Sequence, residues 1–133
     1  MAIAYETGTA TDYLDLMSKV VTLATTDAGL VGASQEWTAL RNTGTEFVLQ
    51  GQGNGSLDEI FVGAKADFDV VDDYYNWKLQ GYSGFIPAQD FDTQPMAITA
   101  DEFQPALLLW NTSITYHLFI TGRKIIIAAQ IAG

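Results

Sequence analysis

The 133-residue sequence contains no cysteine, a single histidine and only three prolines. Without cysteine the chain has no disulfide, no thiolate metal site and no cysteine nucleophile. The lone histidine, His117, excludes every metal site that needs two imidazole ligands, and we expect it to be a packed or surface residue. Stability must therefore come from burial of apolar side chains and from backbone pairing.

Positive charge and long apolar runs are also scarce. Six basic residues face sixteen acidic ones, and the formal charge of −10 opposes attraction to nucleic acid phosphates and anionic lipid. No segment reaches the roughly 18 apolar residues of a membrane span, and the first residues lack the pattern of a secretory signal. We therefore predict that neither nucleic acid nor a membrane is a partner, and that the chain is made in the cytoplasm.

Patterns that could carry catalysis or cofactor binding are weak. The glycine-rich stretch 51–56 has no lysine and precedes an expected strand, so it is typical of a hairpin connection and not of a phosphate-binding loop. Carboxylate pairs for glycoside cleavage, such as Glu59 with Glu102, have no supporting motif. We predict a protein that is not an enzyme and that carries no cofactor.

One acidic cluster is the best candidate for a metal site. Its spacing departs from an EF-hand, because Asp72 stands where glycine is required and Lys78 where a bidentate glutamate belongs. A solvated acidic turn is therefore the favoured interpretation. The four candidate ligands are Asp67, Asp69, Asp72 and Asp73.

What the chain does have is apolar and aromatic content, at 48% and 12%, which is enough for a core. Charged residues make up only 17%, below the roughly 25% of ordinary domains, and such a surface suits protein contact. Trp37 and Tyr82 could form a stacking platform for sugar rings, although tryptophan in strands is more often part of a core.

The opening of the chain predicts an amphipathic helix over residues 12–27. Thr11 is the expected N-cap, and Gly29 supplies the stop signal. The apolar stripe is wide for so short a helix, so it packs on the chain's own sheet or docks on a neighbouring subunit. The stripe residues predicted as contacts are Leu14, Met17 and Val21.

Short runs rich in β-formers follow the helix, separated by glycine and proline turns. We expect one domain over 1–133 and a mainly β fold, with a β-sandwich or jelly-roll-like body over 36–132 and one N-terminal amphipathic helix. The expected strands are 46–50, 59–62, 74–80, 114–120 and 125–132, with a short one at 96–99 inside a long connection from 83 to 105.

The last expected strand is apolar on both faces and therefore needs cover on both sides. The cover is either a second sheet and the helix, a partner chain, or further residues. We predict Ile125, Ile127 and Ile131 as contact residues of this strand.

Several stretches resemble uncharacterised virion structural proteins of tailed bacteriophages. The likeness spans nearly the whole chain. It rests on YLDLMSK at 13–19, Trp37, DEIFVG at 58–63, DYYNWKLQGYSGF at 73–85, LWN at 109–111 and GRKII at 122–126.

The resemblance implies a non-enzymatic structural subunit of a phage particle, in the tail or baseplate, that assembles with itself and with other virion proteins. Its expected location is the virion. The alternatives are a receptor- or carbohydrate-binding module at the particle tip and a capsid decoration or head-associated protein.

Overall fold

A computed structural model describes residues 1–53, 58–98 and 104–131. Ten helices and strands follow one another along these residues. They are β1 (Ala4–Ala10), α1 (Tyr13–Thr26), α2 (Ala28–Gly32), β2 (Thr38–Asn42), β3 (Glu46–Gly51), β4 (Ile60–Asp69), β5 (Tyr74–Tyr82), β6 (Ala106–Leu107), β7 (Ile114–Thr121) and β8 (Lys124–Ile131).

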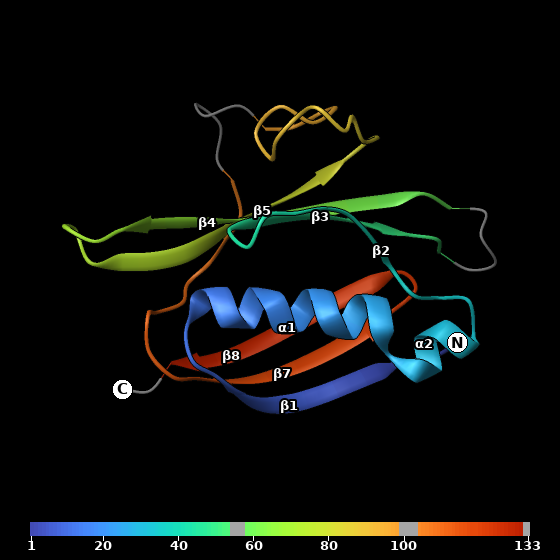
Figure 1. The fold of residues 1–133 in the computed structure, drawn as a ribbon, viewed down its shortest axis with the longest axis horizontal. Helices are drawn as coiled ribbons and strands as arrows, with labels where there is room; N and C mark the ends of the chain where they lie inside the picture. Colours follow the sequence, from blue (N-terminus) through green and yellow to red (C-terminus); the bar gives the residue numbers. More distant parts are fainter. Residues whose placement is uncertain (54–57, 99–103, 132–133) are drawn as a thin grey trace.

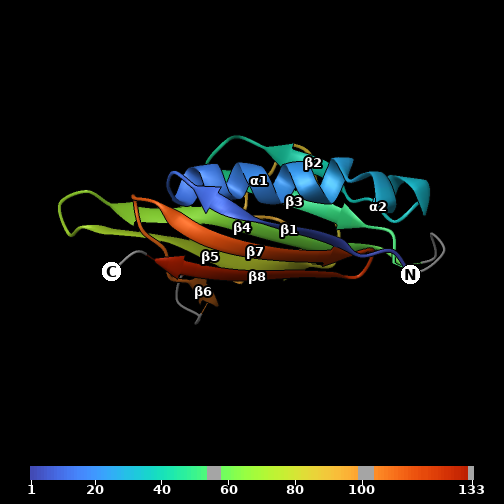
Figure 2. The ribbon, with the colours of Figure 1, turned by 90° about the horizontal axis from the view of Figure 1, so that it is seen from below.

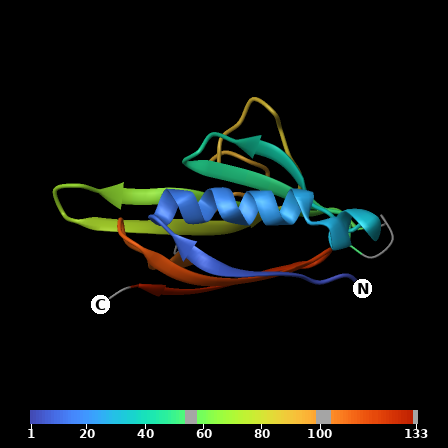
Figure 3. The same ribbon diagram turned by 60° about the horizontal axis from the view of Figure 1, so that its bottom comes forward.

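The strands form two antiparallel sheets, and the prediction of a mainly β fold is confirmed. One sheet has three strands in the order β1-β7-β8, and the other has five in the order β2-β3-β4-β5-β6. Figure 1 shows the two sheets as separate layers, with α1 running between them. The same layering is visible from a different side in Figure 3.

The main core lies between the two layers. On β7 every second residue is buried, which is the alternation of a strand with one face in the core. The buried face of α1 and the inner faces of β3 and β5 complete this core. The inward residues of β7 are Ile114, Tyr116, Leu118 and Ile120.

A second, smaller core covers the other face of the five-stranded sheet. It contains Val48, Phe61, Tyr82 and Phe91, and the connection after β5 supplies Phe91. In Figure 1 this connection, drawn in yellow and orange, lies on the far side of the sheet from α1. The five-stranded sheet is therefore covered on both faces, at least over its middle.

The helical segment differs from the prediction at both ends. The N-cap is Asp12 and not Thr11, because the Asp12 carboxylate accepts hydrogen bonds from the amides of Leu14 and Asp15. Gly29 does not stop the helical region. Asp27 accepts from the amides of Gly29 and Leu30 and so caps the short helix α2 that follows.

Some strands also differ from the prediction. Two strands were not predicted: β1 pairs along its length with β7, and β2 pairs with β3. No strand forms over 96–98, where Met96 has φ +66° and lies in a turn that the Ala97 amide closes by donating to the carbonyl oxygen of Gln94, and Thr99 lies outside the described residues. The loop 51–56 joins β3 to its antiparallel neighbour β4, although residues 54–56 also lie outside the described part of the chain.

Candidate functional site

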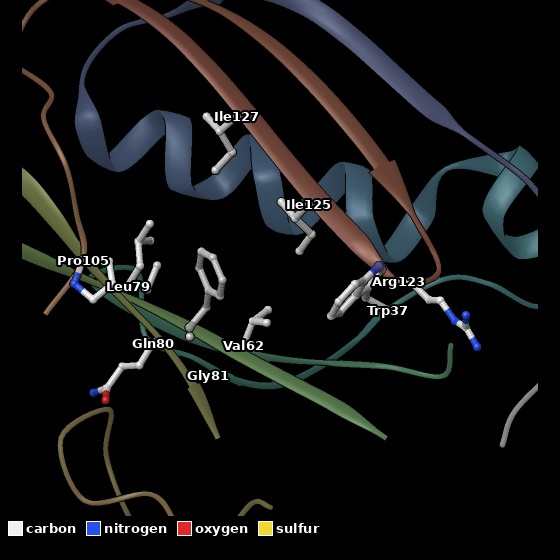
Figure 4. A pocket seen from close by; sticks show the side chains of 12 residues that line it. Trp37, Val62, Leu79, Gln80, Gly81, Pro105, Arg123, Ile125 and Ile127 are labelled. Carbon is white, nitrogen blue, oxygen red and sulfur yellow. The ribbon is translucent and has the colours of Figure 1, made fainter. Parts of the chain in front are cut away.

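An apolar cavity of about 330 Å³ lies between β8 and the five-stranded sheet. Side chains from both sheets line it, as Figure 4 shows, with Ile125 and Ile127 on one wall and Val62 and Leu79 on the other. These four residues are only half-buried, so the cavity is not sealed from solvent. Ordinary ligand pockets begin at about this volume.

The cavity exists because only one side of the space between the sheets is filled. Helix α1 packs against β1 and β7 of one sheet and against β2 and β3 of the other. Figure 2 shows α1 beside β1, whereas β8 lies at the opposite edge of its sheet. No second helix occupies that edge within the described residues, and the inner face of β8 is left half-buried.

Trp37 forms one end of the cavity and joins the two sheets. Its indole N–H donates to the carbonyl oxygen of Thr121 at 2.8 Å, and its side chain is 2% exposed. The ring lies on Gly51, where an added Cβ would come within 2.9 Å of it. Trp37 is therefore a structural residue of the core, and its predicted role in a surface stacking platform is wrong because the ring is buried.

Tyr82, the other residue of the predicted platform, lies on the opposite face of the five-stranded sheet. It is buried, and its hydroxyl donates to the carbonyl oxygen of Phe91 at 2.8 Å. Burial raises the pKa of this phenol well above its ordinary value, with a smaller contribution from nearby carboxylates. Trp37 and Tyr82 thus belong to different cores and form no common surface.

The predicted contact residues on the helix are also placed inside the fold. Met17 and Val21 are buried in the main core, and the half-buried Leu14 packs against it. The apolar stripe of α1 therefore finds its cover within the chain, which was the first of the two alternatives that the sequence left open. Met17 and Val21 are not accessible to a neighbouring subunit.

Strand β8 is the element whose apolar surface stays uncovered. None of its eight residues is buried. Its only strand partner within the described residues is β7, so its other edge is free. Ile126 on the outer face is 52% exposed and Ile131 is 37% exposed, while Ile125 and Ile127 line the cavity. Of the three predicted contact residues of this strand, Ile131 is exposed and Ile125 and Ile127 are half-buried.

The sheet that contains β8 is poor in acidic residues, although the chain carries sixteen of them. Strands β1, β7 and β8 contain one, Glu6, whose carboxylate accepts from the Tyr116 hydroxyl at 2.6 Å. The exposed face of the sheet carries a row formed by Tyr5, Phe119 and Ile126, in register across the three strands. Tyr5 and Phe119 are in ring contact, with centroids 4.8 Å apart. A partner can approach this face without meeting the net negative charge.

The remaining outer-face residue of note is His117. It lies beside Tyr5, with the phenol oxygen 3.2 Å from its Nδ1. The imidazole is exposed and stacks on the Tyr5 ring.

Of the carboxylates considered for glycoside cleavage, Glu59 is exposed and Glu102 lies outside the described residues.

The acidic cluster forms the turn between β4 and β5. Asp69 accepts from the amides of Val71 and Asp72 at 2.7 and 3.1 Å, and Asp67 pairs with Lys78 at 3.7 Å. Among the described residues, no group of three His, Cys, Asp or Glu side chains is placed to hold a metal ion. The four aspartates of the cluster, Asp73 included, form no such group. The carboxylates of the cluster stabilise the turn and are solvated by water.

Two exposed valines at this turn are the feature that the sequence analysis missed. Val70 is 70% exposed and Val71 is 92% exposed. The available signal was an apolar pair between acidic residues at a hairpin turn. The cavity residues Val62 and Leu79 could not be singled out, because their accessibility depends on how the sheets stack.

No protein-family model matches the sequence, and no curated protein matches it either. In the described segments no helix has the length and apolar character needed to cross a bilayer. Any statement about function therefore rests on the residues and surfaces of this chain.

Proposed function

We propose that the chain is a non-enzymatic structural subunit of a tailed-phage particle, in the tail or baseplate, that assembles through the side of the molecule formed by β8. The resemblance in sequence suggests the particle, and the geometry of β8 suggests the mode of assembly. In this interpretation the body is a two-sheet β-sandwich, wedged open on one side by α1. Its partners are copies of itself and other virion proteins.

The observation that carries the proposal is the exposed edge of β8. An apolar strand with a free edge presents unpaired backbone groups in addition to uncovered side chains, and soluble proteins usually protect such an edge with charge, proline or a bulge. Between Ile125 and Ile131 there is no charged residue and no proline. The strand pairs with β7 in unbroken register, so it has no bulge either. Pairing with another chain would satisfy both the backbone and the side chains.

No catalytic arrangement competes with this assignment in the described residues. The cavity is apolar apart from Arg123 and Gln80, and the Gln80 side chain points away from it in Figure 4. The aromatic pair suggested for carbohydrate binding is buried. An assembly role is therefore better supported than a sugar-binding module, and capsid decoration is a variant of the same assembly role.

The proposal is tested by quantitative mass spectrometry of purified particles produced by the genome that encodes the chain. We expect the chain in a fixed copy number per particle, retained through density-gradient purification. A chain that is washed away from intact particles would overturn the proposal.

A matched pair of variants tests the role of β8 separately. Ile131→Lys places a charge on β8, and Val31→Lys places the same charge on α2, where the valine is 48% exposed. We expect Ile131→Lys alone to prevent incorporation, with both variants folded by circular dichroism. Equal incorporation of the two variants would show that this part of β8 is not a contact.

A further inference from the structure

Residues 83–98, which we call the strap, cross the face of the five-stranded sheet that is turned away from α1. Figure 1 shows this segment as a layer of its own, drawn in yellow and orange. The strap contains turns but no helix and no strand. It leaves the sheet and returns to it at nearly the same place, because the Ser83 amide donates to the carbonyl oxygen of Pro95 at 3.2 Å and the Ile98 amide donates to Gln80 of β5 at 2.7 Å.

One side chain provides most of the apolar contact between the strap and the sheet. Within the strap only Phe91 and Gln94 are buried, and Phe91 is completely enclosed. The Phe91 ring meets that of Tyr82 edge to face, with centroids 6.2 Å apart, in the small core that also contains Val48. The Gln94 side chain bonds to backbone groups of the strap itself, so it organises the strap and does not attach it to the sheet.

The backbone of Phe91 is held by the sheet as well. Its carbonyl oxygen accepts from Gln80 Nε2 at 3.0 Å and from the Tyr82 hydroxyl at 2.8 Å. Its amide donates to the Glu46 carboxylate at 3.3 Å. These donors and acceptors belong to β3 and β5, so the bonds form only while the Phe91 ring is in its pocket. Burial of the ring and bonding of the backbone are therefore gained or lost together.

So small an attachment makes the strap less stable than the rest of the fold. Ordering a segment costs conformational entropy at every residue, and here one fully buried apolar side chain offsets most of that cost. The Lys65–Asp92 ion pair that also joins strap and sheet is exposed and adds little. The main core, in contrast, unites buried residues of α1, β3, β5 and β7. Segments with few buried contacts open at a lower free energy than the whole domain.

We propose that the strap is a lid that opens as a unit, by withdrawal of Phe91, while α1 and the two sheets stay folded. The closed strap covers Val48, Phe61 and Tyr82, and the open strap exposes this apolar face of β3, β4 and β5 to solvent. The fold thus contains a second apolar surface that is hidden in the closed form. This inference does not depend on assembly through β8.

The absence of cysteine allows a direct test, because an introduced thiol is unique. Val48→Cys places a thiol under the strap, and Val20→Cys places one in the main core, at a valine that is equally buried. Both full-length variants are treated with dithionitrobenzoate, which reacts with a thiol that is exposed to solvent. We expect Val48→Cys to react at least about tenfold faster than Val20→Cys, yet far more slowly than free cysteine. Its rate should also rise less steeply with urea, because opening of the strap exposes less surface than unfolding does.

Two substitutions then separate opening of the strap from unfolding of the domain. Ile120→Val removes one methylene from the main core and destabilises the closed and the open form equally. It should raise the rate at Val20→Cys by about two- to tenfold and leave the rate at Val48→Cys unchanged. Phe91→Leu destabilises the closed form alone, so it should raise both rates by the same factor, about tenfold.

The possible outcomes are distinct. Equal rates at the two thiols, with equal dependence on urea, would show that the strap opens only when the domain unfolds, and would overturn the inference. An Ile120→Val substitution that raises both rates would overturn it in the same way. Reaction of Val48→Cys at the rate of free cysteine would show that the strap does not cover this face, which also overturns it. None of these results involves β8 or the particle, so each leaves the proposed function standing.

Discussion

Replacement of Trp37 by phenylalanine tests whether the two sheets are joined as described. The indole ring is almost completely buried and holds the carbonyl oxygen of Thr121 across the space between the sheets. Phenylalanine removes this donor and leaves a partly buried carbonyl without a partner, which costs roughly 1–2 kcal/mol. The smaller ring also buries roughly 50 Å² less, or about 1 kcal/mol.

We therefore expect Trp37→Phe to lower the free energy of unfolding by about 2–3 kcal/mol. With a urea m-value of about 2 kcal/mol per molar, the unfolding midpoint falls by about 1 M or slightly more. Urea denaturation followed by circular dichroism measures this change.

Trp110→Phe is the matched control. Trp110 is half-buried and makes an edge contact with Tyr75, and its indole N–H has no hydrogen-bond partner among the described residues. We expect it to cost less than about 1 kcal/mol. If both substitutions lower the midpoint equally, Trp37 does not join the sheets and the wall of the cavity is wrongly assigned.

Three further predictions concern the turn, the glycine under Trp37 and pH. Gly51→Ala should cost about 1–3 kcal/mol by overpacking, since the new Cβ meets the six-membered ring of Trp37, and in a double-mutant cycle with Trp37→Phe the two costs should not add. Asp73 has φ +54°, a backbone conformation that a β-branched residue rarely adopts. Asp73→Val should therefore lower stability by about 1–2 kcal/mol, while Asp73→Gly should change it by no more than about 0.5 kcal/mol. Thermal unfolding that ranks the two variants in the other order would contradict the turn geometry. Burial and the bond to Glu6 raise the pKa of Tyr116 to about 12 from 10.0, so stability should be constant below pH 10 and fall as pH rises through 12. Tyr116→Phe should flatten that alkaline loss in unfolding measurements across pH 9–12, and an unchanged loss would exclude this phenol as its source.

The alternation of apolar with other residues along a strand was the most reliable signal of structure in the sequence. In β7 the apolar residues at every second position are the buried ones, and the hairpin to β8 follows at the expected turn. Strand β1 was missed because its threonines and glycine give little apolar contrast, and because its partner lies more than a hundred residues later in the chain. Local patterns do not reveal such distant pairings.

The candidate site was predictable only in part. The apolar character of β8 on both faces indicated that the strand needs cover on both sides, and none of its residues is buried within the described part of the chain. For α1 the sequence left two alternatives open, and Met17 and Val21 pack inside the fold, because the width of an apolar stripe does not show how many elements surround it. The helix packs between two sheets and needs apolar residues toward both. The cavity depends on how far those sheets are held apart, which no single strand encodes.

Hydrogen–deuterium exchange along β8 tests the central claim most directly, on the unmodified chain in dilute solution and in concentrated or particle-bound form. The free edge of β8 predicts rapid exchange at alternate amides when the chain is dilute, and strong slowing when it is assembled, with β3 unchanged as the internal control. Exchange in β8 that is already slow in the dilute monomer, or that stays the same in the particle, would contradict assembly through this strand.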